Sequence, residues 1–296
     1  MNKQTSFTLI ELLVVIVIIG ILAGVIMIST ASSVNKANIS KLKVFENSID
    51  NNLAANMVSR WKLDQIIGAA APYTTSDAWG SNTGTLGDGI TATTYPTLLS
   101  ESECVTKKCM DFDGLGNYIS IPDNNSLRIY NEITMEGWIN ASSISSTYYS
   151  GLLRKETSYL IMFNPTKTVS TYIYLEGVGW RSCPSPNTIT YGVWHHIVGT
   201  YDGNTIKIFL DGRSNQLTNV GKINLSTANL QIGHGYFGGG VSYLFDGLID
   251  DVRIYSAALS TSQIKQNYIA GLDSLLSNEN ISKEEYNERI NVLAYE

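Results

Sequence analysis

The sequence predicts a long N-terminal helix, then an all-β sandwich, and finally a short helical tail. Residues 7–28 form a nearly unbroken run of Leu, Ile, Val, Ala and Gly. A helical spacing of apolar residues continues to about residue 57, and from residue 58 short alternating runs of Val, Ile, Tyr, Thr and Phe are separated by Gly, Asp, Asn and Pro. The change from a period near 3.6 to a period of two marks the boundary between helix and sheet.

The apolar segment 7–28 is long enough to cross a membrane, because about 20 helical residues span a hydrocarbon core of roughly 30 Å. Glu11 interrupts it. A carboxylate in such a segment is costly and indicates a function or a partner, unless it lies near the headgroups. A secretory signal peptide is the alternative, but the apolar run is too long for one and no Pro or Gly turn follows it.

The helix continues beyond the membrane segment as an amphipathic helix, with charged residues on its other faces. The apolar residues of its second half recur every three or four positions: Leu42, Phe45, Ile49, Leu53 and Met57. This spacing places them on one face. We therefore expect one helix over residues 7–57, with its transmembrane part at 7–28.

The stretch from Phe7 to Ile16, FTLIELLVVI, resembles the N-terminal methylation motif of type IV pilins and type II secretion pseudopilins. The resemblance implies that a prepilin peptidase of the inner membrane removes leader residues 1–6, cutting after Ser6, where the family usually has Gly. It implies methylation of the new Phe7 amine and assembly into a filament. Glu11 would pair with the Phe7 amine of a neighbouring subunit, so that each buried charge compensates the other.

The region after residue 58 contains many short strands and no long helix between them, which indicates a sandwich and not a parallel α/β sheet. Asp202-Gly203-Asn204 predicts a tight turn between two strands, and Asp211-Gly212 ends the second one. The clearest predicted strands are 118–121, 133–141, 168–175, 193–201, 205–210 and 247–255.

Several stretches of this region together resemble the laminin G-like, concanavalin A-type jelly roll. They are Arg60–Asp64, Asp77–Gly84, Phe112–Ile119, Ile133–Trp138, Trp194–Gly203 and Phe245–Tyr255. The resemblance implies a jelly roll over residues 58–270, in which 257–270 is a short closing helix. Residues 271–296 lie outside the family pattern and predict a second, acidic amphipathic helix.

Proteins of this fold often hold one structural calcium ion, and calcium prefers oxygen ligands. By resemblance, Asp250 in the closing strand is the best side-chain candidate, and Asp64 and Asp113 are the others. The alternative is that these residues are ordinary turn aspartates that accept hydrogen bonds from backbone N–H groups. No other cofactor is indicated.

Catalysis is not indicated by the sequence. Hydrolases of this fold need two carboxylates about 5–9.5 Å apart, but Glu136 is isolated on its strand and no acidic pair at even spacing appears on a central strand. His195 and His196 are consecutive on a strand and so point to opposite faces. We expect one of them to be packed and the other exposed, and we expect no enzymatic activity.

Aromatic residues in loops are the candidate ligand-binding residues, because carbohydrate sites combine aromatic faces with nearby polar groups. Aromatic residues are also abundant in sandwich cores, which is the alternative for each of them. The candidates are Tyr148, Tyr149, Trp180, Tyr236 and Phe237.

The three cysteines do not fit a redox or zinc motif. Cys104 and Cys109 are expected to form a local disulfide if the domain lies outside the cytoplasm. The alternative is three unpaired thiols, and Cys183 has no assigned role.

The net charge is −6 and no basic patch is present, which argues against a nucleic-acid partner. The expected partners are other pilin subunits, the prepilin peptidase, the inner membrane, and a glycan or surface protein. The chain would cross the inner membrane once and then display its sandwich on a surface filament. Two alternatives remain: a structural pseudopilin of a secretion system, and a membrane-anchored binding domain that never assembles.

Overall fold

A computed structural model of the chain describes residues 13, 54–144, 149–235 and 243–293. The chain divides into two compact units, Met1–Asn51 and Asn52–Glu296. Within the described ranges, no helix is both long enough and apolar enough to cross a membrane. The predicted membrane segment 7–28, with Ser6, Phe7 and Glu11, lies outside these ranges apart from Leu13, so these predictions stay untested by the structure.

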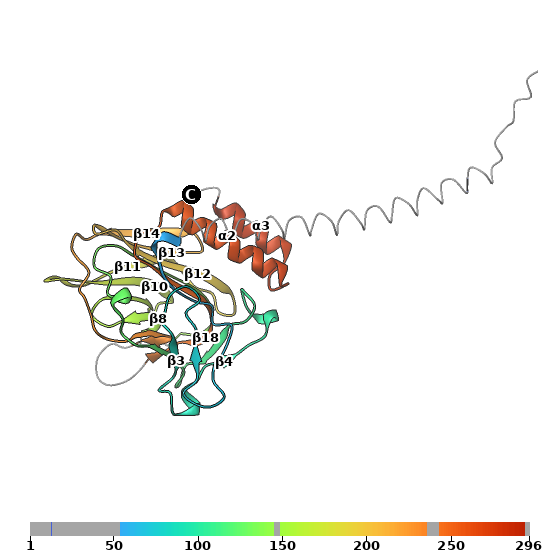
Figure 1. Cartoon of the computed structure of the whole chain (residues 1–296). Helices are drawn as coiled ribbons and strands as arrows, with labels where there is room; N and C mark the ends of the chain where they lie inside the picture. Colours follow the sequence, from blue (N-terminus) through green and yellow to red (C-terminus); the bar gives the residue numbers. More distant parts are fainter. Residues whose placement is uncertain (1–12, 14–53, 145–148, 236–242, 294–296) are drawn as a thin grey trace, which may run out of the picture. The chain divides into compact units, whose positions relative to one another are not determined.

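Two eight-stranded antiparallel sheets form the second unit (Figure 1). The first sheet has the order β14 (Arg213–Thr218), β13 (Thr205–Leu210), β12 (Trp194–Tyr201), β7 (Ile133–Ser143), β18 (Asp246–Tyr255), β5 (Met110–Asp113) and β4 (Thr97–Leu98), and β1 (Met57–Trp61) also pairs with β18. The second has the order β11 (Gly179–Thr188), β10 (Thr168–Leu175), β9 (Tyr159–Phe163), β8 (Ser150–Lys155), β15 (Leu230–Ile232), β6 (Ile119–Ile121), β3 (Gly84–Leu86) and β2 (Thr74–Thr75).

Smaller elements complete the unit. A separate ribbon pairs β16 (His234–Gly235) with β17 (Tyr243–Leu244). The short 3₁₀ helices among the described residues are η1 (Ala54–Asn56), η2 (Ala92–Thr94), η3 (Glu101–Glu103) and η4 (Asn125–Leu127). Residues 54–57, which the sequence assigns to the end of the long helix, form η1 and the first residue of β1. Met57 is buried and pairs with Tyr255, so this residue belongs to the sheet and not to the helix.

The main apolar core lies between the two sheets, as the alternating pattern of the strands predicts. Met135 and Ile139 of β7 lie in this core with Ile161 of β9 and Ile173 of β10. The predicted strands 168–175 and 205–210 are confirmed with the same bounds. The turn between β12 and β13 is confirmed as well, since Asp202 Oδ1 accepts the N–H groups of Asn204 (2.9 Å) and Thr205 (2.7 Å).

Two helices follow β18, and one of them covers the outer face of the first sheet (Figure 1). Helix α2 (Thr261–Ser277) begins at a capping box formed by Ser260 and Gln263. Asn267 Nδ2 donates to Glu136 Oε2 (2.9 Å), and the Tyr268 ring stacks on His196 of the sheet. Because α2 shields this face from water, β7 and β12 are buried on both sides.

The bounds of the C-terminal helices differ from the sequence prediction. The predicted helix 257–270 begins only at Thr261, after its Ser260 cap, and continues to Ser277, so the expected boundary at 270 lies inside α2. The second helix, α3, is Lys283–Leu293, which is shorter than the predicted 271–296; residues 294–296 lie outside the described ranges. Gly271 does not interrupt α2, because its missing side chain leaves room for Trp138.

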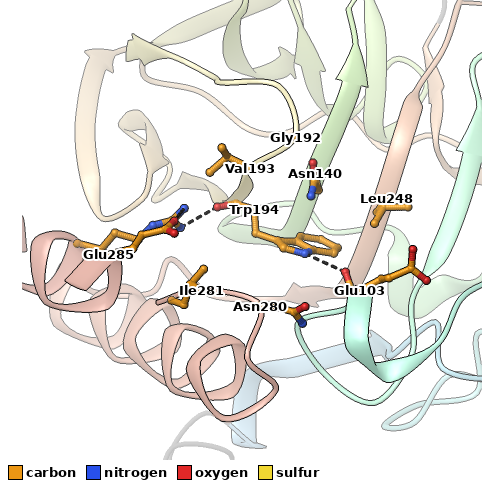
Figure 2. Close-up of a pocket in the computed structure, with 10 residues that line it drawn as sticks. Glu103, Asn140, Gly192, Val193, Trp194, Leu248, Asn280, Ile281 and Glu285 are labelled. Carbon is orange, nitrogen blue, oxygen red and sulfur yellow. Dashed lines mark hydrogen bonds and ion pairs between the residues drawn. The ribbon is translucent and has the colours of Figure 1, made fainter. Parts of the chain in front are cut away.

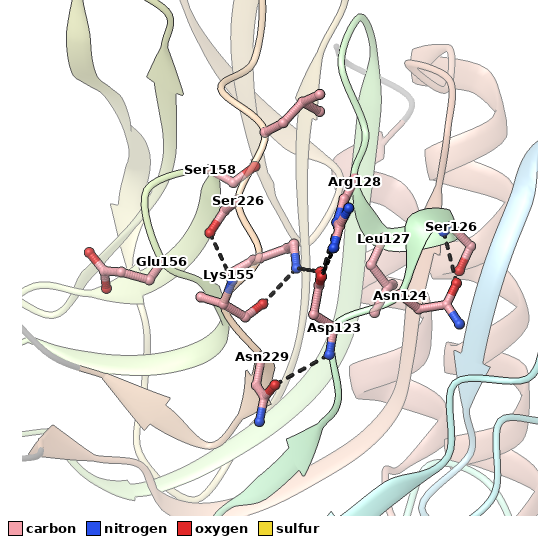
Figure 3. A network of polar contacts seen from close by, with 12 residues as sticks. Asp123, Asn124, Ser126, Leu127, Arg128, Lys155, Glu156, Ser158, Ser226 and Asn229 are labelled. Atoms are coloured by element: carbon pink, nitrogen blue, oxygen red, sulfur yellow. Dashed lines mark hydrogen bonds and ion pairs between the residues drawn. The ribbon is translucent and has the colours of Figure 1, made fainter.

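A buried ion pair ties the second sheet to its connecting loops (Figure 3). Lys155 of β8 is fully buried, and its Nζ lies 2.7 Å from Asp123 Oδ1 and 2.6 Å from the Ala228 carbonyl oxygen. Arg128 also donates to Asp123, from Nε to Oδ2 over 2.9 Å. The hydrogen bond from Arg128 and the contacts with Lys155 lower the pKa of Asp123 to about 2.

Candidate functional site

An aromatic strip lies on the outer face of the second sheet, where β10 meets the edge strand β11. Tyr174 faces Trp180 in the ladder, with ring centroids 5.2 Å apart and nearly perpendicular planes. Tyr172, two residues earlier on the same face, meets the same indole edge to face at 6.5 Å. All three side chains are half-exposed. We name Tyr172, Tyr174 and Trp180 the aromatic strip.

Polar groups border the aromatic strip. The Tyr172 hydroxyl donates to Asn164 Oδ1 (3.1 Å), and Asn164 Nδ2 donates to Ser170 Oγ (2.8 Å), so the amide is held in one orientation. Burial raises the pKa of Tyr172 to about 12, and the neighbouring Tyr149 hydroxyl adds to the shift. Tyr149 is therefore close to the strip.

The same face carries a polar group two strands away from Tyr172. Arg154 of β8 pairs with Leu160 of β9, and Leu160 pairs with Tyr172, so Arg154 lies roughly 10 Å from Tyr172. Arg154 donates to Gln231 Oε1 (3.1 Å) and pairs with Glu156. Planar side chains of this kind bind adjacent hydroxyl groups, and the aromatic rings offer flat apolar faces. Because Arg154 is itself buried, the half-exposed Glu156 and the half-exposed rings form the accessible part of this face.

The sequence found only part of this surface. Trp180 is a member of the strip and Tyr149 lies beside it, but Tyr148, Tyr236 and Phe237 lie outside the described ranges. Sequence reasoning missed Tyr172 and Tyr174, which lie within a correctly predicted strand. The alternation of side chains along β10 is the signal that could have identified them. Ile173 and Leu175 are buried, so Tyr172 and Tyr174 face outward.

The three calcium candidates do not come together. Asp113 Oδ1 accepts the N–H groups of Leu115 and Gly116, both at 2.9 Å, as in an ordinary aspartate turn. The Asp250 carboxylate is fully buried and accepts from Thr106 N over 2.8 Å. Asp64 lies at a separate surface hollow beside Lys107. Over the described ranges no cluster of three metal-binding side chains occurs. These residues do not fit one ion in this arrangement, and calcium stays a prediction from the resemblance.

The side chains of Glu136, His195 and His196 all have polar partners within the domain. His196 Nε2 lies 2.9 Å from Glu136 Oε1, and both side chains are buried beneath α2. His195 Nδ1 lies 2.6 Å from Asp211 Oδ2, and its Nε2 accepts from Thr190 N (2.9 Å). The expectation that one histidine is exposed is wrong, because both are buried. Helix α2 covers His196, whereas His195 is enclosed by its contacts with Thr190 and Asp211.

A disulfide joins Cys104 and Cys109, as predicted, with their Cα atoms 5.4 Å apart. Cys183 is a free, buried thiol, and burial raises its pKa to about 11. Burial therefore favours the protonated thiol, which is the less nucleophilic form.

The two parts of the chain match two families. A two-layer antiparallel sandwich with an aromatic strip on one outer face is a jelly-roll domain of the lectin type. The family model described as "Concanavalin A-like lectin/glucanases superfamily" matches residues 113–265, and the chain belongs to this superfamily. Residues 1–27 match the prokaryotic N-terminal methylation motif, so the chain joins this motif to the jelly roll.

Solved structures share the fold. Domain 4 of AbnA, a GH43 extracellular arabinanase from Geobacillus stearothermophilus determined with arabinotriose, is 20% identical; the match covers 71% of this chain and 97% of that one, with a TM-score of 0.53. The ligand binding domain of Botulinum neurotoxin serotype D, determined with N-acetylneuraminic acid, is 14% identical; the match covers 76% of this chain and 53% of that one, with a TM-score of 0.56.

A third similar structure is the binding domain of Paraclostridial Mosquitocidal Protein 1, at 12% identity and a TM-score of 0.55. That match covers 75% of this chain and 53% of that one, so the chain spans about half the length of the two toxin domains. Identities this low show the fold alone. No curated protein matches the chain.

Proposed function

We propose that this protein is a pilin-like subunit that assembles through its N-terminal helix and binds a glycan at the cell surface through the outer face of its second sheet. The single observation that carries the binding half is the aromatic strip. The strip consists of three half-exposed rings at the edge of the sheet: Trp180, Tyr172 and Tyr174. Packing of the core does not require three large rings at this position.

The composition of this face favours a neutral or weakly charged sugar. Arg154 is buried and paired with the half-exposed Glu156, so the pair adds little net charge to this face. Burial and then the positive charge of Arg154 lower the pKa of His234 to about 4, so its ring is neutral at pH 7. A face with balanced charge, polar planar groups and aromatic rings suits the hydroxyl-rich faces of an oligosaccharide.

Assembly is supported by the methylation motif in residues 1–27. In this proposal Ser6 precedes the cleavage point, Phe7 becomes the methylated N-terminus, and Glu11 pairs with the Phe7 amine of a neighbouring subunit. The prepilin peptidase and other pilin subunits are the corresponding partners, and the chain moves from the inner membrane to a surface filament. The protein is proposed to bind and not to catalyse.

Glycan binding is tested with the full-length chain in detergent on an oligosaccharide array that includes arabinotriose and N-acetylneuraminic acid. We expect Trp180→Ala to weaken the strongest binding about tenfold or more, since loss of a central aromatic contact exceeds about 1.4 kcal/mol. Trp79→Ala is the matched control, because Trp79 is 47% exposed and lies outside the strip. Equal binding by both variants, or no binding by the parent chain, would contradict the proposal and favour a purely structural head.

Assembly is tested by mass spectrometry of the N-terminal peptide from membranes and from the sheared surface fraction. A peptide that begins at methylated Phe7 in the sheared fraction is the expected result. An intact Met1 found only in membranes would instead show an anchored domain that does not assemble.

A further inference from the structure

The disulfide loop, residues 104–109, is bound to the turn that connects α2 to α3. Asn278 Nδ2 in this turn lies 3.1 Å from the Thr106 carbonyl oxygen and 3.4 Å from that of Val105. Asn280 Nδ2 donates to the Cys104 carbonyl oxygen over 2.7 Å. Two amide side chains of the turn therefore donate hydrogen bonds to the backbone carbonyl groups of one short loop.

The opposite side of the disulfide loop is bound to the first sheet. The Thr106 hydroxyl lies 3.1 Å from Asp250 Oδ1, and its backbone N–H donates to Oδ2 of the same carboxyl group. Cys104, Val105 and Cys109 are buried in a second hydrophobic cluster. The disulfide loop thus connects β18 to the turn between the helices, and its conformation determines where three carbonyl groups point.

The two helices differ in how they are held. Helix α2 buries Ile264, Tyr268, Leu272 and Leu275. Helix α3 has no fully buried residue. Three of the buried residues of α2, Tyr268, Leu272 and Leu275, share a hydrophobic cluster with the disulfide loop. Helix α2 is also fixed to β7 by the Asn267–Glu136 hydrogen bond and by the close contact of Gly271 with Trp138, so it depends less on the loop than α3 does.

Helix α3 is held by partly buried apolar side chains and by a few polar contacts. Tyr286, Ile290 and Leu293 pack against the hydrophobic cluster that includes the disulfide loop. Tyr286 donates to Asp273 Oδ1 (2.6 Å), and Arg289 Nη1 donates to the Trp194 carbonyl oxygen (2.8 Å). Lys265 reaches the Leu293 carbonyl oxygen over 3.2 Å. The contacts of Tyr286 and Lys265 join α3 to α2, so they depend on where the turn places α3.

We propose that the Cys104–Cys109 disulfide is a redox switch that controls the docking of residues 278–293, the turn and α3. A dithiol reductant breaks the S–S bond; each sulfur gains one electron and one proton, and the reductant becomes a disulfide. The open loop then samples many conformations, so docking must fix both the loop and the turn. A disulfide oxidant reverses the step: it takes up the two electrons and two protons of the Cys104 and Cys109 thiols and becomes a dithiol, and α3 docks again.

The switch also determines the wall of a cleft of ≈ 300 Å³ shown in Figure 2. Glu103, which precedes the disulfide loop, and Trp194 line one part of it, and the Trp194 indole donates to the Glu103 carbonyl oxygen. Asn280, Glu285 and Arg289 from the turn and α3 line the other part. Release of α3 would remove these residues and open the cleft.

The proposal is tested by hydrogen exchange and mass spectrometry on the full-length chain in detergent, carrying Cys183→Ala so that the pair provides the only thiols. We expect dithiothreitol to accelerate exchange in residues 283–293 about tenfold or more, as local opening does. Exchange in α2 and β7 should not change. Unchanged exchange in α3, with the mass showing two free thiols, would overturn the proposal, and so would equal acceleration in α2 and β7.

A second variant separates the contact from the disulfide itself. Asn278→Ala combined with Asn280→Ala should release α3 while the disulfide stays intact, and dithiothreitol should then add little. Asn287→Ala is the matched control, because Asn287 is exposed on α3. If the double variant exchanges like the parent chain, the carbonyl contacts do not couple the loop to α3 and the switch is refuted.

Discussion

Gly271 of α2 lies directly against the indole ring of Trp138 on β7. A Cβ atom at position 271 would overlap Cζ2 and Cε2 of that ring. Trp138 also contacts Tyr268 and His196, with ring centroids 5.7 and 4.9 Å away. A glycine inside a helix is normally unfavourable, so this contact explains why the helix keeps one here.

The Gly271→Ala variant should be less stable despite the better helix propensity of Ala. Overpacking costs about 1–3 kcal/mol, whereas Ala in a helix gains about 1 kcal/mol over Gly. We expect a net loss of about 1 kcal/mol, measured by urea unfolding of the full chain in detergent. Ser274→Ala, on the same helix, is the control and should change stability by less than about 0.5 kcal/mol. A stabilised Gly271→Ala variant would contradict the close contact.

Replacing Lys155 should destabilise the sandwich. Lys155→Met keeps most of the buried hydrocarbon chain but removes the donor to Asp123 and to the Ala228 carbonyl oxygen. Because Arg128 still compensates Asp123, we expect a loss of about 2–3 kcal/mol, below the range for leaving a charge unpaired. Lys207→Met on β13, which is only half-buried, is the control in the same unfolding experiment. Equal stability of the two variants would contradict the role of the buried pair.

Asp250 should make stability depend on pH. Burial and then the negative charge of Asp251 raise the pKa of Asp250 to about 8. An unfolded Asp releases its proton near pH 3.9. Between about pH 4 and 8 the folded chain therefore binds more protons, so this group's contribution to the unfolding free energy falls as the pH rises, by up to about 1.4 kcal/mol per pH unit.

The Asp250→Asn variant cannot titrate at this position, so its unfolding free energy should fall less steeply as the pH rises from about 4 to 8. Urea unfolding of both proteins at pH 5, 6, 7 and 8 measures the difference. Parallel curves for the two proteins would show that Asp250 titrates near its ordinary pKa.

Glu11→Gln should reduce filament assembly. In the proposed filament the carboxylate compensates the Phe7 amine of a neighbouring subunit, and the neutral amide leaves that charge unpaired. We expect the share of the chain in the sheared surface fraction to fall about tenfold or more, the equivalent of about 1.4 kcal/mol. Glu46→Gln, in the predicted amphipathic half of the helix, is the control. Normal assembly of Glu11→Gln would exclude the predicted pairing.

The sequence by itself determined the two-part organisation of the protein and the class of its sandwich. The methylation motif is local, and FTLIELLVVI is recognisable without any fold. The strands 168–175 and 205–210 were also predictable, because alternating side chains and an Asp-Gly turn are encoded by neighbouring residues. The disulfide between Cys104 and Cys109 was predictable for the same reason, since only four residues separate the two thiols.

Only the tertiary structure decided which faces meet water and which side chains meet each other. Both His195 and His196 are buried, but the burial of His196 depends on α2, which is distant in sequence, and that of His195 on contacts with Thr190 and Asp211. Tyr172 and Tyr174 join Trp180 through the register of β10 against β11, and alternation alone does not show which face is open. The physical reason is that local patterns fix the backbone conformation, whereas burial and contact depend on elements brought together by folding.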